Sequence, residues 1–182
     1  NGGQLVNIEK LFHASNTSVP GTVNVNVANF IQNGPISIPA TTTLNYLATN
    51  DLTPNFSIVN NGTFIINSAA SVLNLDTSGV GDFTNNGTFR VQSATQLNNS
   101  LAFDHSGTTF DLQPGSEFRV QRIGAIVGSL NLNGGPISGS GTLTINDEAV
   151  LNVASPQVMS AGMTLNLVNG SITNAQNLTI PN

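Results

Sequence analysis

The densest group of ionisable residues lies between positions 104 and 122. Its candidate site residues are Asp104, Asp111, Glu117 and Arg119. Two carboxylates about 5–10 Å apart can carry out glycoside hydrolysis, so Asp104 and Asp111 form a candidate pair for that reaction. The alternative is a solvated face on which neighbouring charges form local ion pairs. We favour this second interpretation.

Other catalytic and metal-binding patterns are missing from the sequence. There is no Cys, which excludes thiol catalysis, disulfides and zinc fingers. The two His residues, His13 and His105, lie too far apart in sequence to suggest a metal site. No Ser-His-Asp spacing or Gly-rich phosphate loop is recognisable, and Asp147-Glu148 falls at an expected turn, where acidic residues are ordinary. We therefore predict that the protein is not an enzyme and holds no metal or cofactor.

The composition narrows the class of protein and its compartment. Lys and Arg together number four and Asp and Glu nine, for a net charge of −5. Such a chain lacks the basic footprint of a nucleic-acid-binding protein. No apolar run approaches the roughly 20 residues that span a membrane. Charged residues are 7% of the chain, and a surface solvated by Asn, Ser and Thr instead predicts an extracellular or cell-surface location.

A Thr-Φ dipeptide, in which Φ is apolar, recurs along the chain. Its threonines are Thr22, Thr43, Thr63, Thr88, Thr109, Thr142 and Thr164. Consecutive copies stand at similar intervals, except that Thr109 and Thr142 lie further apart. A second apolar residue follows two positions after each Φ, and turn residues such as Asn61-Gly62 and Asn86-Gly87 separate the segments. Each unit is therefore expected to form three short strands whose apolar residues share one face.

Units of this size cannot bury an apolar face alone, whereas stacked units bury one continuous core. The sequence thus predicts an all-β fold, a single right-handed parallel β-helix of about seven to eight three-strand rungs. In this fold Phe64, Phe89 and Phe110 would form a vertical file. The long interval from Thr109 to Thr142 is read as one rung with an insertion, or as one and a half rungs. A β-sandwich is the alternative, but it does not predict a pattern that recurs at nearly constant spacing.

The two ends of the chain depart from this repeat. Residues 1–14 are predicted to form an N-terminal cap, as a short helix, or a first strand, and residues 15–182 to form the β-solenoid. Residues 166–182 keep the repeat pattern with no obvious cap. This suggests that a longer chain or another subunit continues the stack there.

The seven repeated threonines are a candidate binding face. A residue that precedes an inward Φ points outward, so the alignment predicts a Thr ladder along one side of the helix. Such an array resembles the ice-binding face of antifreeze solenoids. We favour a structural role, since Thr is a good strand former and its hydroxyls can pair between rungs. The same alignment places Arg90 over Asp111, as an outward salt bridge between neighbouring rungs.

Segments 139–153 (GSGTLTINDEAVLNV) and 60–67 (NNGTFIIN) resemble the repeats of right-handed β-helical surface proteins, such as autotransporter passengers and filamentous-haemagglutinin-like adhesins. The resemblance spans residues 15–180. It implies a non-enzymatic extracellular structural or adhesive protein, either a surface adhesin segment or a subunit of a self-assembling fibre. The fold also hosts polysaccharide-active and ice-binding proteins. A polysaccharide-binding or polysaccharide-degrading β-helix and an ice-binding protein that uses the Thr ladder are therefore alternatives.

The partners expected of such a solenoid follow from its surface. A stiff, weakly charged face rich in amides and hydroxyls suits glycans or a second copy of the chain. Open rung edges can pair end to end with the next subunit by strand addition. We expect no nucleic acid and no membrane-spanning segment.

Overall fold

The computed structural model describes residues 4–6, 11–13, 17–18, 21–26, 30–32, 35–49, 51–52, 57–70, 72–76, 82–98, 102–122 and 127–181. Within these ranges nearly all regular structure is β-strand, and the helical part is one short 3-10 turn, η1 (Ala175–Asn177). No helix in this part of the chain is long and apolar enough to cross a bilayer.

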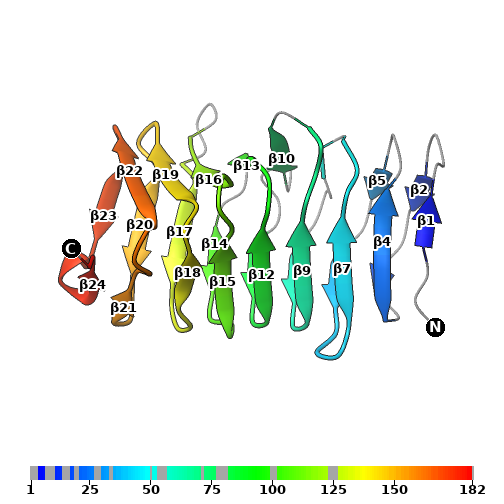
Figure 1. Cartoon of the computed structure of the whole chain (residues 1–182), viewed down its shortest axis with the longest axis horizontal. Helices are drawn as coiled ribbons and strands as arrows, with labels where there is room; N and C mark the ends of the chain where they lie inside the picture. Colours follow the sequence, from blue (N-terminus) through cyan, green and yellow to red (C-terminus); the bar gives the residue numbers. More distant parts are fainter. Residues whose placement is uncertain are drawn as a thin grey trace.

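Most strands belong to three parallel sheets, which form the three sides of a coil (Figure 1). The first sheet contains β1 (Gln4–Val6), β4 (Thr22–Asn26), β7 (Thr43–Tyr46), β9 (Thr63–Ile66), β12 (Thr88–Val91), β15 (Thr109–Leu112) and β18 (Ile137–Gly139). The second sheet contains β10 (Leu73–Asp76), β13 (Thr95–Asn98), β16 (Glu117–Val120), β19 (Thr142–Asn146) and β22 (Thr164–Val168). The third sheet contains β3 (Thr17–Ser18), β6 (Ile36–Ile38), β8 (Ile58–Asn60), β11 (Phe83–Asn85), β14 (Phe103–His105), β17 (Ser129–Leu132), β20 (Val150–Val153) and β23 (Ser171–Thr173).

Two further strand pairs complete the coil near its ends. At the N-terminal end β2 (Leu11–His13) pairs with β5 (Phe30–Gln32), and at the C-terminal end β21 (Gln157–Val158) pairs with β24 (Leu178–Thr179). Residues 1–14 thus include two strands, β1 and β2, each paired in parallel with a strand of the following turn.

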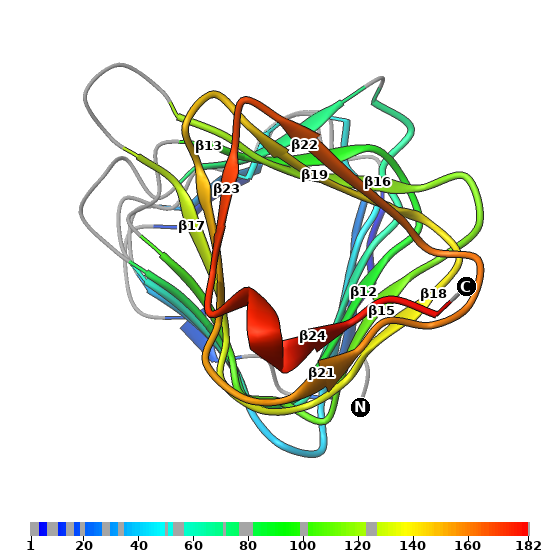
Figure 2. The ribbon, with the colours of Figure 1, turned by 90° about the vertical axis from the view of Figure 1, so that its left-hand side faces the viewer.

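The expected β-solenoid is confirmed, and the β-sandwich is excluded. Each strand pairs in parallel with strands of the neighbouring turns, as β12 does with β9 and β15. Figure 2 views the coil from its C-terminal end, and the chain runs counterclockwise as it approaches the viewer. This sense of winding makes the coil right-handed.

The number of turns is slightly smaller than expected. The second side of the coil is continuous from the bridge at Leu52 through β10, β13, β16, β19 and β22, which gives about six turns with all three sides stacked. Before Leu52 the second side is the separate β2–β5 pair. The predicted seven to eight rungs therefore overestimate the fully continuous coil.

The core is one apolar column inside the coil. Short strands with alternating apolar residues place one set of side chains inward, and stacking brings these sets into register. Phe64, Phe89 and Phe110 occupy equivalent register positions, with ring centroids 5.5 and 5.2 Å apart along the file. The predicted vertical file is confirmed. Phe83 and Phe103 stack beside it from the third sheet, 4.4 Å apart.

Glycines stack at the corner between the third and the first sheet. A Cβ placed on Gly87 would lie 2.0 Å from the Gly62 oxygen, and one on Gly107 would lie 2.2 Å from the Gly87 oxygen. Gly135 continues this series in the next turn, 1.8 Å from the Gly107 oxygen by the same measure. Successive backbones approach so closely here that a side chain has no space. We name Gly62, Gly87, Gly107 and Gly135 the glycine corner.

The structure corrects the alignment of Thr142 with Thr109 across the long interval of the repeat, because the two threonines lie on different sides of the coil. In the structure β15 pairs with β18, so Phe110 lies next to Ile137. Thr142 begins β19 of the second sheet, where it pairs with Glu117. The interval therefore contains about one and a third turns, because β17 and β18 complete one turn before Thr142. Residues 123–126, part of the apolar stretch in this interval, lie outside the described residues.

Candidate functional site

The four residues of the expected polar patch lie on three different sides of the coil. Asp104 is on β14 of the third sheet, Asp111 on β15 of the first, and Glu117 and Arg119 on β16 of the second. The patch prediction is wrong, because three consecutive strands of one turn face three directions. The structure therefore separates Asp104 from Asp111, the pair considered for glycoside hydrolysis.

Each of these residues instead bonds to its own side of the coil. Arg119 donates from Nη2 to both Glu117 oxygens, at 3.2 and 3.0 Å. Thr144, one turn further along, donates to Glu117 Oε1 at 2.6 Å. On the third sheet Asn131 Nδ2 donates to Asp104 Oδ1 at 2.7 Å. The Arg119–Glu117 pair lies within one strand, and the bonds from Thr144 and Asn131 link neighbouring turns, as expected of a solvated face with local pairing.

The salt bridge expected between Arg90 and Asp111 is confirmed. The two residues pair in register across β12 and β15, and Arg90 Nε lies 2.8 Å from Asp111 Oδ2. Gln113 Nε2 donates to the same oxygen at 2.7 Å. The carboxylate is nearly buried by these partners, whereas the Arg90 side chain remains 39% exposed.

The Thr ladder exists in the first sheet but is shorter than expected. Five of its members stand in register on consecutive strands of this sheet: Thr22, Thr43, Thr63, Thr88 and Thr109. Thr142 and Thr164 pair with each other on the second sheet. The single column of seven is therefore wrong, since the repeat shifts by one side of the coil after Thr109. The Thr88 hydroxyl lies 3.1 Å from that of Thr108, next to the ladder.

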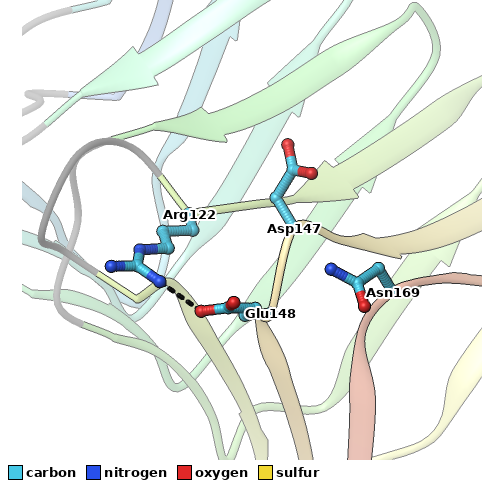
Figure 3. Close-up of a pocket in the computed structure, with 4 residues that line it drawn as sticks. All are labelled: Arg122, Asp147, Glu148 and Asn169. Carbon is cyan, nitrogen blue, oxygen red and sulfur yellow. Dashed lines mark hydrogen bonds and ion pairs between the residues drawn. The ribbon is translucent and has the colours of Figure 1, made fainter.

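A pocket that sequence reasoning did not select lies at the corner between the second and the third sheet. Arg122 follows β16, Asp147 and Glu148 form the turn from β19 to β20, and Asn169 lies between β22 and β23. Together they line an open pocket of about 270 Å³ (Figure 3). Arg122 Nη1 pairs with Glu148 Oε2, while the Asp147 carboxylate points away from this pair.

The backbone of this pocket adopts an unusual conformation. Asp147, Glu148 and Asn169 have φ values of 48°, 63° and 59°, and they are three of the four non-glycine residues with positive φ in the described part of the chain. Asn and Asp tolerate this region, whereas Glu rarely adopts it. Two backbone hydrogen bonds hold this turn: Asp147 N donates to Val168 O, and Glu148 N donates to Asn169 O, both in the following turn of the coil. Strained residues often gather at binding sites.

The pocket presents a guanidinium, two carboxylates and an amide to solvent. These groups offer hydrogen-bond donors and acceptors on one small surface, which suits a ligand rich in hydroxyl groups. The sequence predicts only an ordinary turn at Asp147-Glu148. A signal for the pocket was the Glu in a tight turn, but its partners Arg122 and Asn169 come from other turns and become neighbours only in the stacked coil.

A second polar cluster is fully buried beside the glycine corner. Asn60, Asn85 and His105 occupy one register column of the third sheet, and each is 0% exposed. Asn60 Nδ2 donates to Asn85 Oδ1 at 2.6 Å, and Asn85 Nδ2 lies 2.8 Å from His105 Nδ1. Burial lowers the pKa of His105 to about 4, although the Pro136 backbone opposes this shift. We name these three residues the inner ladder.

Burial, with Asp51 as the smaller cause, also raises the pKa of Tyr46. Within the described ranges, no three His, Asp or Glu side chains gather closely enough to hold a metal ion.

Comparisons of the chain with protein-family models, curated proteins and solved structures found no match. The β-solenoid is therefore the part of the sequence resemblance that the structure supports.

Proposed function

We propose that this protein is a non-enzymatic structural or adhesive β-solenoid that acts outside the cell, as a segment of a surface adhesin or as a subunit of a fibre. The observation that carries this proposal is the use of outward polar side chains to connect turns. Asn45 bonds to Asn24 at 2.6 Å on the first sheet, and Asn131 bonds to Asp104 at 2.7 Å on the third. Such ladders stiffen a rod and leave few groups free to converge on a substrate.

The second sheet supports the same proposal. Asn74 donates to Asp51 Oδ2 at 2.8 Å, Gln96 to Asn74 Oδ1 at 3.3 Å, and Arg119 to Gln96 Oε1 at 3.4 Å. A chain of side-chain hydrogen bonds thus crosses four successive turns. The low charge and the amide-rich surface of the protein favour an extracellular location, where it would project as a rigid spacer.

The last turn supports assembly through the open end of the coil. Its exposed apolar side chains are Val158, Leu167, Val168 and Ile180. Parallel edge strands with exposed apolar groups readily accept a further strand. In the fibre form of this proposal, the first turn of a second copy packs against the exposed last turn and continues the stack.

Electron microscopy and sedimentation at increasing protein concentration test the fibre form. We expect rods that lengthen by whole copies in the native chain, and shorter assemblies when Leu167→Lys places a charge on the open end. Asn166→Lys adds the same charge at an exposed neighbouring position and serves as the matched control. Monomers alone at high concentration would rule out the fibre form and leave the adhesin form.

A second candidate function, polysaccharide binding, is favoured by the pocket at Arg122, Asp147, Glu148 and Asn169. Its clustered donors and acceptors suit the vicinal hydroxyls of a sugar. Binding to immobilised neutral and acidic polysaccharides should fall at least about tenfold in Asp147→Asn, and remain unchanged in Asp82→Asn, which removes the same charge elsewhere. Equal binding by both variants would exclude the pocket as the site.

A further inference from the structure

The inner ladder ends at a histidine that no other function accounts for. Asn60 and Asn85 repeat an amide at one position, and in the next turn His105 replaces it. The following residue in register is Leu132, and the preceding one is Ile38. The polar column is thus closed at both ends by aliphatic side chains.

Hydrogen bonds fix the direction of this ladder. Asn60 Oδ1 accepts from Gly62 N at 3.2 Å, and its Nδ2 donates to Thr88 O at 2.8 Å and to Asn85 Oδ1. Asn85 Oδ1 is therefore an acceptor, and Asn85 Nδ2 must donate to His105 Nδ1. Because that nitrogen accepts, the ring is neutral and carries its proton on Nε2.

The other ring nitrogen is enclosed with little compensation. His105 Nε2 is buried and makes no hydrogen bond of ordinary geometry with the described residues, although the Pro136 backbone interacts with the ring and opposes the lowering of its pKa. A Cβ on Gly135 would lie 2.9 Å from it, so the last member of the glycine corner covers the ring closely. Gly135 also lines an open pocket of about 420 Å³. Displacement of this turn would therefore expose the imidazole to solvent.

The surroundings offer no opposite charge to a protonated ring. The neighbours of His105 are Asn85 on β11, Leu132 on β17, Phe110 on β15 and the turn at Gly135 and Pro136. Phe110 meets the ring edge-on at 5.7 Å. The charges nearest in sequence, Asp104 and Asp111, bond to Asn131 and Arg90. None of the described groups facing His105 is a carboxylate.

We propose that the inner ladder and the glycine corner form an acid-sensitive latch, in which protonation of His105 opens the corner and loosens the coil. A proton on Nδ1 would face the Asn85 Nδ2 donor. Rotating the Asn85 amide to accept this proton would turn its Nδ2 toward Asn60 Nδ2, which is held by Thr88 O. Two donors would therefore face each other at one position of the ladder or the next. Displacement of the turn at Gly135 removes this conflict, because water can then hydrate the protonated ring.

The direction of the pH effect follows from the lowered pKa of His105, about 4 against 6.5 for a free side chain. A base whose pKa is lowered by folding is protonated more readily in the open state. The contribution of the neutral His105 to the free energy of unfolding is therefore fully present above pH 6.5, and it is lost as the pH falls toward 4. Over this range the opening equilibrium shifts by up to about tenfold per pH unit.

Chemical denaturation of the whole chain at pH 7, 6, 5 and 4 tests this latch. His105→Asn extends the amide ladder by one member and removes the titrating group. We expect the native chain to lose much more stability than this variant between pH 6.5 and pH 4. His13→Asn is the control, and it should follow the native chain. Equal pH dependence in the native chain and His105→Asn would overturn the proposal.

Nitrogen-15 NMR of histidine-labelled protein gives an answer that does not depend on the variant folding. We expect His105 to remain neutral above pH 5 in the folded state, with the proton on Nε2. Acidification should then lower the amide protection factors, corrected for the intrinsic pH dependence of exchange, at Ser106 and Asn133, whose N–H groups donate to Asn85 O and His105 O. It should do so before it lowers those of the first sheet. A folded-state titration of His105 near pH 6.5, or uniform exchange along the coil, would contradict the latch.

Discussion

The central turns and the last turn share one repeat but differ in burial. Phe64, Phe89 and Phe110 in the centre are 0% exposed, whereas Leu167 and Val168 in the last turn are 48% and 53% exposed. The backbone does not cause this difference, because β22 pairs in register with β19. A central turn is covered by a neighbour on each side, and the last is covered on one side. The core of this protein is therefore a product of stacking rather than of any single turn.

The largest effect is expected from Phe89→Ala in the centre. The Phe89 ring lies within 5.7 Å, centroid to centroid, of five other phenylalanine rings: those of Phe64, Phe83, Phe103, Phe110 and Phe118. Its removal leaves a cavity between layers that cannot collapse, at a cost of about 3–5 kcal/mol of unfolding free energy. Chemical denaturation measures this loss.

Leu167→Ala in the last turn is the matched comparison. Half of this side chain already lies in water, so the cost should stay below about 1 kcal/mol. Similar losses for the two variants would mean that the centre and the end do not differ as described.

The next largest loss of unfolding free energy is expected at the glycine corner, which recurs in the central turns. Gly87→Ala would place a Cβ 2.0 Å from the Gly62 oxygen, and two backbones would have to separate. We expect a loss of about 2–3 kcal/mol, typical of overpacking. Gly134→Ala provides the control, because its nearest atom would be 3.2 Å away. Thermal unfolding should rank Gly87→Ala clearly below Gly134→Ala.

The next comparison is between Asn85→Ala in the buried inner ladder and Asn152→Ala, which changes an outward side chain near the C-terminal end of the coil. The first variant leaves His105 Nδ1 buried without a donor, which costs about 1–2 kcal/mol. Asn152→Ala removes the half-buried acceptor of Thr173 and Asn174, and water can replace it. Its cost should be under about 0.5 kcal/mol. Denaturation midpoints that fall together would show that burial does not distinguish the two ladders.

The smallest effect is expected from Asp111→Asn on the surface of the centre. The partner Arg90 is partly exposed, so the ion pair contributes about 0.2–1 kcal/mol. The difference from the native chain should shrink as sodium chloride is raised, because salt screens exposed charges. A loss that is large and independent of salt would show that Asp111 is held by its hydrogen bonds instead.

Much of the fold could be predicted from the sequence. The regular period of the Thr-Φ repeat identified the coil, and aligning copies on Φ predicted both the phenylalanine file and the Arg90–Asp111 bridge. These features depend on the repeat alone. Where copies have equal length, register in sequence and register in space agree.

The alignment failed where the length of a turn changed. Between Thr109 and Thr142 the sequence contains an extra third of a turn, so a Thr-Φ pair reappeared on another sheet. The same residue pattern forms a strand on any side of the coil. Local sequence therefore does not report which side it occupies, and the Thr ladder was extended too far.

The sites were harder to predict than the fold, for a physical reason. The expected patch used residues close in sequence, yet one turn sends Asp104, Asp111 and Glu117 to three sides. The pocket at Arg122 and the inner ladder are formed by residues from successive turns. Neighbours of this kind depend on the exact length of each intervening corner, and repeat spacing alone does not supply it.

The most direct measurement of the stacked coil is the distance between two spin labels on the first sheet. The chain has no Cys, so labels can be placed by Thr22→Cys with Thr109→Cys, and by Thr43→Cys with Thr109→Cys. Double electron–electron resonance should give a distance of about 19 Å for the first pair, which is four rungs apart. The distance for the second pair should be shorter by the spacing of one rung, which is about 4.8 Å. If moving the label from Thr22 to Thr43 changed the distance by much more than one rung, or lengthened it, the result would contradict the coil.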